Sequence, residues 1–249
     1  MTFQIIIPAR YASTRFPGKP LALIGDKPMI QHVYEQARKV VEQVYVATDD
    51  KRIYEAVEQF GGQAIMTSDQ HRSGTDRICE AYQNINSQAD VVINIQGDEP
   101  FIKPEQIQQL MKCFDNPNTQ IATLVRPFKQ DENIFDPNIV KVVISEHDHR
   151  AIYFSRSAIP YLRGVEQEQW LQKQTYYAHI GMYAYRANTL QQITRMPQSA
   201  LERSESLEQL RWIEAGIPIY VGITEFSTIG IDTPEDLAQA NKVKIERSY

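Results

Sequence analysis

Residues 3–21 read FQIIIPARYASTRFPGKPL, an apolar segment that continues into a basic loop. Three consecutive isoleucines, Ile5–Ile7, are typical of a strand that is buried on both faces. The loop carries Arg10, Arg15 and Lys19 among small residues, and it contains no acid. Small residues let backbone N–H groups approach a phosphate chain, and the three cations would neutralise its charge. We therefore predict a buried first strand followed by an anion-binding loop.

Apolar strand-like segments alternate with helical patterns as far as about residue 126. The segments that we expect to be strands are Phe3–Pro8, Val44–Thr48, Ala64–Met66, Val91–Ile95 and Ile121–Val125. Apolar residues recur at helical spacing in Met29–Val41, Lys51–Phe60, Thr75–Ile85 and Pro104–Phe114. Continuous apolar strands separated by helices predict an α/β fold with a mostly parallel sheet flanked by helices. Since ligands of such sheets bind beyond the carboxyl ends of the strands, we expect a site in the loops after Ile7, Thr48 or Ile95.

The pattern changes after about Pro127. The later segments that we expect to be strands are Val140–Ser145, Ala151–Phe154 and Tyr176–Arg186, and the expected helices are Glu205–Ala215 and Pro234–Glu246. The last helix has an N-cap threonine, a proline at its first position and acids in its first turn. Without a repeat or an obvious linker, we predict a single domain over residues 1–249, with a first half of about 1–126 and a mixed second half of about 127–249.

Composition excludes several classes of protein. The 249 residues include 26 basic and 31 acidic side chains, a net charge of −5, which disfavours a general nucleic-acid binder. Hydrophobic content of 42% is ordinary for a globular chain. Two cysteines, Cys79 and Cys113, are too few for a disulfide framework or a Cys-rich zinc site. No apolar run approaches the roughly 20 residues of a membrane span, and no signal-peptide pattern is present, so we expect a cytoplasmic protein without membrane insertion.

The basic loop leaves two interpretations open on residue type alone. Its glycine spacing matches neither a Walker P-loop nor the Rossmann dinucleotide fingerprint. An anion-binding loop is favoured by three cations directly after a buried strand with no compensating acid. The alternative is a solvated surface loop that happens to be basic.

Two aspartates are candidates for a metal site. Asp98 follows the apolar strand expected at Val91–Ile95, and Asp232 precedes the capped helix that begins near Pro234. Loops of this kind can meet on one side of a sheet, and Mg²⁺ is bound through one or two carboxylates together with substrate phosphates. The alternatives are that Asp98 is a turn residue and that Asp232 only helps to start its helix.

One expected strand has a polar and aromatic face. Along Tyr176–Arg186 the residues of this face are His179, Gly181, Tyr183 and Tyr185. The opposite face, with Ile180, Met182 and Ala184, would point into the core. A lone histidine is more often structural, but a row of histidine and tyrosine on one face is a better candidate for sugar binding.

Several motifs in this order resemble one family. They are residues 8–21, RSGTDR at 72–77, NIQGDEP at 94–100, YFSR at 153–156, LEQLR at 207–211 and GIDTPEDL at 230–237. Together they resemble the 3-deoxy-manno-octulosonate cytidylyltransferases, or CMP-Kdo synthetases, over nearly the whole chain. Asp76 stands where many members of that family have glutamate. The resemblance implies a Rossmann-like nucleotidyltransferase fold whose first half binds the nucleotide and whose mixed second half binds the sugar and makes dimer contacts.

The resemblance also implies a reaction and a set of site residues. CTP and the acidic sugar Kdo would give CMP-Kdo and pyrophosphate with Mg²⁺, on the way to lipopolysaccharide. The implied catalytic residues are Arg10, Lys19, Asp98 and Asp232, of which Asp98 and Asp232 are the metal ligands. The implied nucleotide-binding residues are Pro8, Ala9, Arg10, Ser13, Lys19, Ser73, Arg77 and Gln96. The implied sugar-binding residues are Arg15, Gln96, Arg156, His179, Tyr183, Glu208 and Gln209.

Residue types alone leave alternatives for some of these positions. Arg77 would otherwise lie on a solvated helix face, and Glu208 and Gln209 would be exposed polar positions of a helix. The residues 147–149, His-Asp-His, are interpreted as a polar turn between strands rather than as a metal site.

Rival functions stay open as well. The sugar acid could be 8-amino-Kdo or sialic acid. More distantly, the Asp49-Asp50 pair is compatible with a nucleotide-sugar glycosyltransferase. A third class is a non-enzymatic nucleotide-binding module. Homodimerisation is an expectation that rests on the family resemblance.

Overall fold

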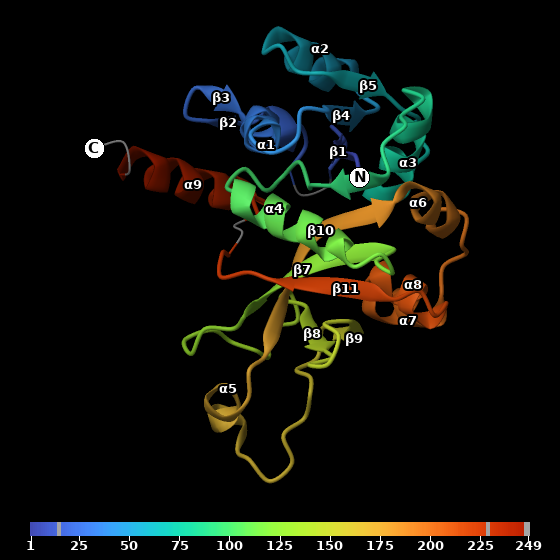
Figure 1. Ribbon diagram of the computed structural model, residues 1–249. Helices are drawn as coiled ribbons and strands as arrows, with labels where there is room; N and C mark the ends of the chain where they lie inside the picture. Colours follow the sequence, from blue (N-terminus) through green and yellow to red (C-terminus); the bar gives the residue numbers. More distant parts are fainter. Residues whose placement is uncertain (14–15, 228–229, 247–249) are drawn as a thin grey trace. The chain divides into compact units, whose positions relative to one another are not determined.

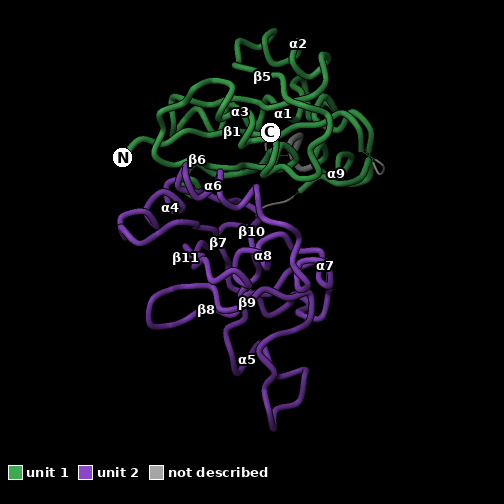
Figure 2. Tube along the Cα trace, turned by 90° about the vertical axis from the view of Figure 1, so that its right-hand side faces the viewer, with its two compact units in different colours: residues 1–107, 228–249 green, residues 108–227 purple. Residues whose placement is uncertain are grey.

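The computed structural model describes residues 1–13, 16–227 and 230–246 (Figure 1). Arg15, one of the predicted sugar-binding residues, lies outside the described residues. The chain divides into two compact units, which Figure 2 shows in different colours. Unit 1 contains residues 1–107 and 228–249, and unit 2 contains residues 108–227. The helix α4 (Pro104–Lys112) includes the boundary between them.

The sheet of unit 1 is parallel and is built from the first four strands expected in the sequence. These are β1 (Phe3–Ala9), β4 (Val44–Thr48), β5 (Ala64–Met66) and β6 (Val91–Asn94). Their order is β6-β1-β4-β5, and Ile5 of β1 lies opposite Val44 on one side and Ile93 on the other. All three isoleucines of β1 are fully buried, as the run of β-branched residues predicted.

Three helices connect these strands. They are α1 (Met29–Arg38), α2 (Lys51–Gln59) and α3 (Gly74–Asn84). From β1 the chain passes through α1 to β4 and then through α2 to β5. The helix α3 then takes the chain back to β6, on the other side of β1. Since such crossovers are right-handed, α1 and α2 lie on one face of the sheet and α3 lies on the other. The predicted α/β architecture with a helix-flanked parallel sheet is confirmed for this unit.

The strand order places a topological switch point at β1. The chain leaves β1 toward β4, whereas β6 pairs with β1 along the opposite edge. The loops that follow β1 and β6 therefore start side by side and diverge, which opens a crevice beyond their carboxyl ends. Gly97, in the loop after β6, allows this close approach, because a Cβ there would lie 3.1 Å from the carbonyl oxygen of Pro8.

The C-terminal segment belongs to unit 1. Its helix α9 (Pro234–Glu246) begins where the sequence predicted. The Thr233 hydroxyl accepts a hydrogen bond from the Asp236 amide at 3.2 Å, and the Asp236 carboxylate accepts bonds from the amides of Asp232 and Thr233 at 3.0 and 2.9 Å. Ile231 and Ala240 are buried in a cluster with Ile24 and Met29. Ile24 belongs to the small hairpin of β2 (Leu23–Ile24) and β3 (Lys27–Pro28).

Unit 2 has a mixed sheet, as the change of pattern after residue 127 indicated. Its strands are β7 (Ile121–Pro127), β8 (Lys141–Ile144), β9 (Ala151–Ser155), β10 (Tyr177–Arg186) and β11 (Ile219–Ile223). β11 is parallel to β7, whereas β10 is antiparallel to both β7 and β8, and β9 is antiparallel to β8. Residues 145–150, which include the His-Asp-His segment, form the turn between β8 and β9.

The helices of unit 2 differ from the expectation. They are α5 (Trp170–Lys173), α6 (Ala187–Ile193), α7 (Ala200–Glu205) and α8 (Gln209–Glu214). The helix predicted over Glu205–Ala215 is confirmed as α8, but its predicted start is wrong, because Glu205 ends α7 and Ser206 has φ 52° and ψ 46°, in the left-handed region. The elements α6 and β11 were not predicted, because they are short and have no long periodic pattern. In the parts of the chain that the structure describes, no helix combines the length and the apolar character that crossing a membrane requires.

Candidate active site

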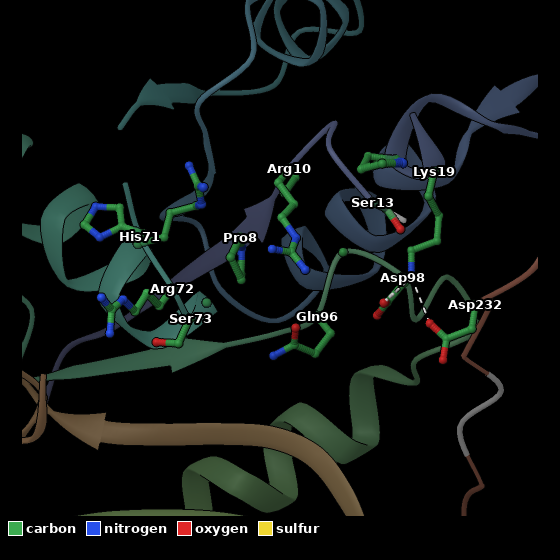
Figure 3. A pocket seen from close by; sticks show the side chains of 15 residues that line it. Pro8, Arg10, Ser13, Lys19, His71, Arg72, Ser73, Gln96, Asp98 and Asp232 are labelled. Carbon is green, nitrogen blue, oxygen red and sulfur yellow. Dashed lines mark hydrogen bonds and ion pairs between the residues drawn. The ribbon is translucent and has the colours of Figure 1, made fainter. Parts of the chain in front are cut away.

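A pocket in unit 1 lies at the switch point (Figure 3). Its walls come from the loop after β1, the segment that leads into α3, the loop after β6, and Asp232. The predicted residues that line it are Pro8, Ala9, Arg10, Ser13, Lys19, Ser73, Arg77, Gln96, Asp98 and Asp232. The fold therefore brings together every described residue of unit 1 that the sequence analysis assigned to nucleotide, catalysis or metal. Their individual roles stay predictions.

The loop after β1 folds back on itself. The Gly18 amide donates a hydrogen bond to the carbonyl oxygen of Tyr11 at 2.9 Å, and Gly18 has φ 71°, a conformation that glycine adopts without strain. The guanidinium carbon of Arg52, from α2, lies 3.3 Å from the centroid of the Tyr11 ring. As a result, Arg10 and Lys19 extend from the two ends of the loop into the same pocket (Figure 3).

Lys19 lies between the two candidate metal ligands. Its Nζ donates hydrogen bonds to Oδ2 of Asp98 at 2.6 Å and to Oδ1 of Asp232 at 3.1 Å (Figure 3). The backbone supports this arrangement, because the Ile231 amide donates to the Asp98 carbonyl oxygen at 3.0 Å. The side chain of Lys19 is 14% exposed, whereas those of Asp98 and Asp232 are 34% and 48% exposed. The carboxylates therefore face an opening from which a ligand can enter.

The donor set at this position fits a divalent cation. Two carboxylate oxygens already hold the ammonium group of Lys19 between them, so the geometry accommodates a positive charge. Among the described residues, no three side chains of the His, Cys, Asp or Glu types come together as a metal cluster. Mg²⁺ suits such a site, because it prefers oxygen ligands and completes its shell with water and substrate phosphates.

Glu99, directly after Asp98, is a group that the sequence analysis did not assign. Its Oε2 is buried and has no hydrogen-bond partner among the described residues. Burial, together with the neighbouring charge of Asp98, raises the pKa of Glu99 to about 8. The side chain is therefore mainly protonated at neutral pH and adds little negative charge to the site.

The N-terminus of α3 forms another wall of the pocket. The Ser73 hydroxyl caps the helix by accepting a hydrogen bond from the Asp76 amide at 3.1 Å. A Cβ at Gly74 would lie 3.2 Å from Cγ of Pro8, so the helix begins close against the end of β1. Backbone N–H groups and the positive end of the helix dipole at this position favour a bound anion.

Arg77 has a different environment from the solvated helix face that residue type alone would favour, and that alternative is wrong. Its side chain is buried and donates to Oδ2 of Asp49 at 2.9 Å and to the Thr67 hydroxyl at 2.7 Å. It therefore connects α3 to the segments that follow β4 and β5. Asp50, the neighbour of Asp49, caps α2 and is paired with Arg52. The loop after Thr48 therefore does not line the pocket. It supports the pocket indirectly, because its Asp49 holds Arg77 in place.

Two of the predicted sugar residues of unit 2, His179 and Tyr183, lie on β10. The register of β10 against β7 shifts by two residues between Ile180 and Tyr183, which keeps the alternation of faces. The rings of His179 and Tyr183 lie 5.3 Å apart, and those of Tyr183 and Tyr185 lie 5.9 Å apart, so the predicted common face exists. Trp212 of α8 packs against both tyrosines and buries them.

Most of the other predicted sugar residues are hydrogen-bonded within unit 2. Arg156 Nε donates to the Glu205 carbonyl oxygen at 2.7 Å, and Glu208 accepts from Arg211 at 3.2 Å. Gln209 is only 5% exposed, so the alternative of an exposed polar position is wrong for it. His179 shares a hydrogen bond of 3.0 Å with the Thr123 hydroxyl, and burial lowers the pKa of its imidazole to about 3. The imidazole is therefore neutral at physiological pH.

Comparison with known proteins identifies the family. The family model described as cytidylyltransferase matches residues 4–221. A 3-deoxy-manno-octulosonate cytidylyltransferase of Parabacteroides distasonis is 63% identical over 244 residues, which cover 96% of this chain and 97% of that protein. The chain belongs to the 3-deoxy-manno-octulosonate cytidylyltransferase family. A second 3-deoxy-manno-octulosonate cytidylyltransferase, from Phocaeicola vulgatus, is 58% identical over 96% of each chain.

A solved structure supports the same family on the level of the fold. It is a CMP:2-keto-3-deoxy-manno-octonic acid synthetase complexed with CTP. Its TM-score to this chain is 0.91 at 45% identity, and the alignment covers 99% of this chain and 100% of that one. The predicted resemblance, the nucleotidyltransferase fold and the assignment as an enzyme of the nucleotidyltransferase class are confirmed.

Five lining residues were not among the predicted site residues, namely Pro20, His71, Arg72, Gly74 and Gly97. Of these, His71 and Arg72 have polar side chains beside the start of α3, and the His71 Nε2 contacts the Glu80 carboxylate. A signal existed for Arg72, since it opens the RSGTDR motif at residues 72–77. His71 precedes that motif and carries no local pattern of its own, so only the tertiary structure reveals its place.

Proposed function

We propose that this cytidylyltransferase transfers the cytidylyl group of CTP to the anomeric hydroxyl of 3-deoxy-D-manno-octulosonate (Kdo), which yields CMP-Kdo and pyrophosphate. The observation that carries the proposal is the pocket at the switch point, where a basic loop faces a pair of carboxylates. The high identity to proteins named for this activity supports the same substrates. The product would serve lipopolysaccharide synthesis, and the enzyme would act in the cytoplasm.

The triphosphate is proposed to bind between the basic loop and the start of α3. Arg10 and Lys19 supply positive charge, and Ser13 offers a hydroxyl from the same loop. The N–H groups of the first turn of α3 lie on the other wall. Together these groups surround a polyanion with donors from two directions, which is how proteins commonly hold phosphate chains.

The nucleoside is proposed to lie along the residues at the ends of β1 and β6. The backbone of Pro8 and Ala9, the Ser73 hydroxyl and the Gln96 amide line the pocket there. Cytosine presents an amino donor and carbonyl acceptors, which backbone and amide groups can recognise. Arg77 would contribute by holding α3 in place, since its guanidinium is occupied by Asp49 and Thr67.

The chemical step needs no covalent protein intermediate. The sugar hydroxyl oxygen forms a bond to the α-phosphorus, the bond from that phosphorus to the bridging oxygen breaks, and pyrophosphate leaves with the electron pair while the hydroxyl proton passes to water. Arg10 and Lys19 would stabilise the charge that develops on the phosphoryl oxygens. Asp98 and Asp232 would hold Mg²⁺, which when bound neutralises phosphate charge and lowers the pKa of a coordinated hydroxyl.

The residues proposed for the sugar acid in unit 2 are those that the family resemblance implies, Arg156, His179, Tyr183, Glu208 and Gln209. A carboxylate requires cationic donors, which Arg156 provides, and hydroxyl groups suit the neutral imidazole and the phenol. The closest alternative is another sugar acid, either 8-amino-Kdo or sialic acid.

A glycosyltransferase is disfavoured by the surroundings of the Asp49-Asp50 pair. Asp49 is paired with Arg77, and Asp50 is paired with Arg52 and caps α2. Both carboxylates are therefore paired with arginines, and neither aspartate lines the pocket. Asp98 and Asp232, which face the opening, are better placed for a metal that accompanies a free nucleoside triphosphate.

The decisive experiment is product identification by mass spectrometry after mixing the enzyme with CTP, Mg²⁺ and Kdo. We expect CMP-Kdo together with one equivalent of pyrophosphate. Parallel reactions with 8-amino-Kdo and sialic acid test the choice of sugar, and faster turnover of either would replace Kdo in the proposal. Absence of turnover with all three sugars would contradict the proposed reaction.

We also propose a homodimer. Sedimentation at micromolar concentration tests it, and a monomer alone would contradict it.

A further inference from the structure

Lys19 stands in two roles that it cannot fill at the same time. The proposed function assigns its ammonium to the triphosphate, but this group lies between Asp98 and Asp232, at 2.6 and 3.1 Å from their oxygens. A flexible side chain at a pocket rim could instead extend into solvent. Its position between the two carboxylates instead makes Asp98 and Asp232 its ion-pair partners.

The same oxygens are the proposed metal ligands. A divalent cation held by Asp98 and Asp232 would take the place of the Nζ of Lys19 between the two carboxylates. The two cations would repel each other in a partly shielded site. Metal entry therefore requires that the ammonium group leave.

The surrounding structure allows such an exchange without rearrangement of the carboxylates. Asp98 and Asp232 belong to segments joined by the hydrogen bond from the Ile231 amide to the Asp98 carbonyl oxygen. The Asp232 amide is held by Asp236 at the start of α9. Lys19 has only its side chain in the site, and Arg10 extends into the same pocket, so phosphates bound there would offer the ammonium group a nearby anion (Figure 3).

We propose that Lys19 is an internal counter-ion of the metal site, which holds Asp98 and Asp232 together in the free enzyme and competes with the divalent cation until a nucleoside triphosphate draws it away. This inference rests on the proposed metal site and adds to it the order in which metal and nucleotide bind. The free enzyme binds the metal weakly, and metal and nucleotide enter together. Lys19 thus links occupation of the phosphate subsite to opening of the metal subsite.

The test is Mn²⁺ binding to the enzyme without nucleotide, measured from the electron paramagnetic resonance signal of the free ion. The neutral variant Lys19→Met is expected to bind Mn²⁺ about tenfold more tightly than the wild type, because two ion pairs no longer compete. Lys19→Arg retains the charge and should bind as weakly as the wild type. Lys51→Met is the matched control, since Lys51 is an exposed residue of α2 and its removal should change nothing.

Two further measurements distinguish a failure of this inference from a failure of the proposed function. Lys19→Ala repeats the neutral change without a side chain in the site, so the test stands if Lys19→Met does not fold. Water proton relaxation measures Mn²⁺ on the wild-type enzyme with a CTP analogue that has a methylene group between the α- and β-phosphorus. No enzyme-bound Mn²⁺ in that ternary mixture overturns the metal site itself. A normal ternary complex with unchanged binary affinity in the neutral variants overturns only the role given to Lys19.

Discussion

Lys19 is 79 residues from Asp98 and 213 residues from Asp232 along the chain, yet a single ammonium group contacts both carboxylates. Opposite charges of this kind hold a site together, since two carboxylates without a cation between them repel each other. Each ion pair contributes only modestly to the stability of the folded state, because the side chains of the aspartates are 34% and 48% exposed. The effect of changing these residues should therefore appear in catalysis rather than in stability.

The first prediction concerns Asp98→Asn, which keeps the shape of the side chain and removes its charge. We expect turnover to fall by roughly 10²–10³-fold or more, since the site loses a ligand of the metal that would balance the charge of the reacting phosphates. Pyrophosphate release under saturating CTP and Kdo measures the effect, and circular dichroism checks the fold. Asp131→Asn, at an exposed position of unit 2, is the control. Turnover near the wild-type rate in Asp98→Asn would refute the metal assignment.

The second prediction concerns His179, whose pKa burial lowers to about 3 from an ordinary value near 6.5. As pH falls from 7 toward 3, the unfolded chain takes up a proton at this position and the folded chain does not, so the folded state loses stability. His179→Gln should therefore lose less stability than the wild type between pH 7 and pH 4, measured as the urea midpoint. The exposed His147→Gln is the control and should follow the wild type. Identical profiles for His179→Gln and the wild type would show that His179 makes no such contribution.

Helix ends decide much of the architecture at the scale of elements. The capping threonine, the proline and the acids before α9 predicted its start correctly, because an N-cap acts within four residues. The break at Ser206 between α7 and α8 was not predicted. Ser206 is in the left-handed region, and the two helices contact each other through Glu202, which is buried and paired with Arg211 of α8.

A third prediction concerns the start of α7. Ser199 caps α7 in a capping box, in which its hydroxyl accepts from the Glu202 amide at 3.2 Å and the Glu202 carboxylate accepts from the Ser199 amide at 3.3 Å. Ser199→Ala should reduce the free energy of unfolding by about 1 kcal/mol in urea titrations. Ser204→Ala, which removes an exposed hydroxyl in the same helix, should stay within about 0.5 kcal/mol of the wild type. Equal effects of the two changes would contradict the importance of the cap.

The whole molecule brings its N-terminal loop, the loop after β6 and its C-terminal segment into one pocket of unit 1. Ligands that bind such a site only in the folded state raise the melting temperature. The rise in melting temperature with each ligand alone, compared with the rise with both, therefore shows whether metal and nucleotide bind together.

The fourth prediction follows from that coupling. With CTP and Mg²⁺ at about 100 times the dissociation constant, stabilisation of roughly 2.7 kcal/mol should raise the melting temperature by about 5–10 °C. Mg²⁺ alone should raise it by much less, since Lys19 already occupies the carboxylates. Differential scanning fluorimetry with each ligand alone and with both measures the two shifts. A shift with Mg²⁺ alone as large as that with both ligands would contradict the coupling.

The sequence by itself determined the strands and helices of the first half and the loop at which to search for a site. Runs such as Ile5–Ile7 and periodic apolar positions act over a few residues, so they can be recognised without the fold. The family motifs likewise indicated the residues that line the pocket. All of these signals are local or were recognised as short motifs in a known order.

Only the tertiary structure decided which of those residues are in contact, which are buried and which are protonated. The contact of Lys19 with both aspartates, the burial of Arg77 against Asp49 and the cover of Trp212 over Tyr183 each join segments far apart in the chain. Desolvation likewise made the His179 imidazole neutral and raised the pKa of Glu99. Pairing and burial depend on packing across the whole unit, and residue type and spacing carry no measure of that packing.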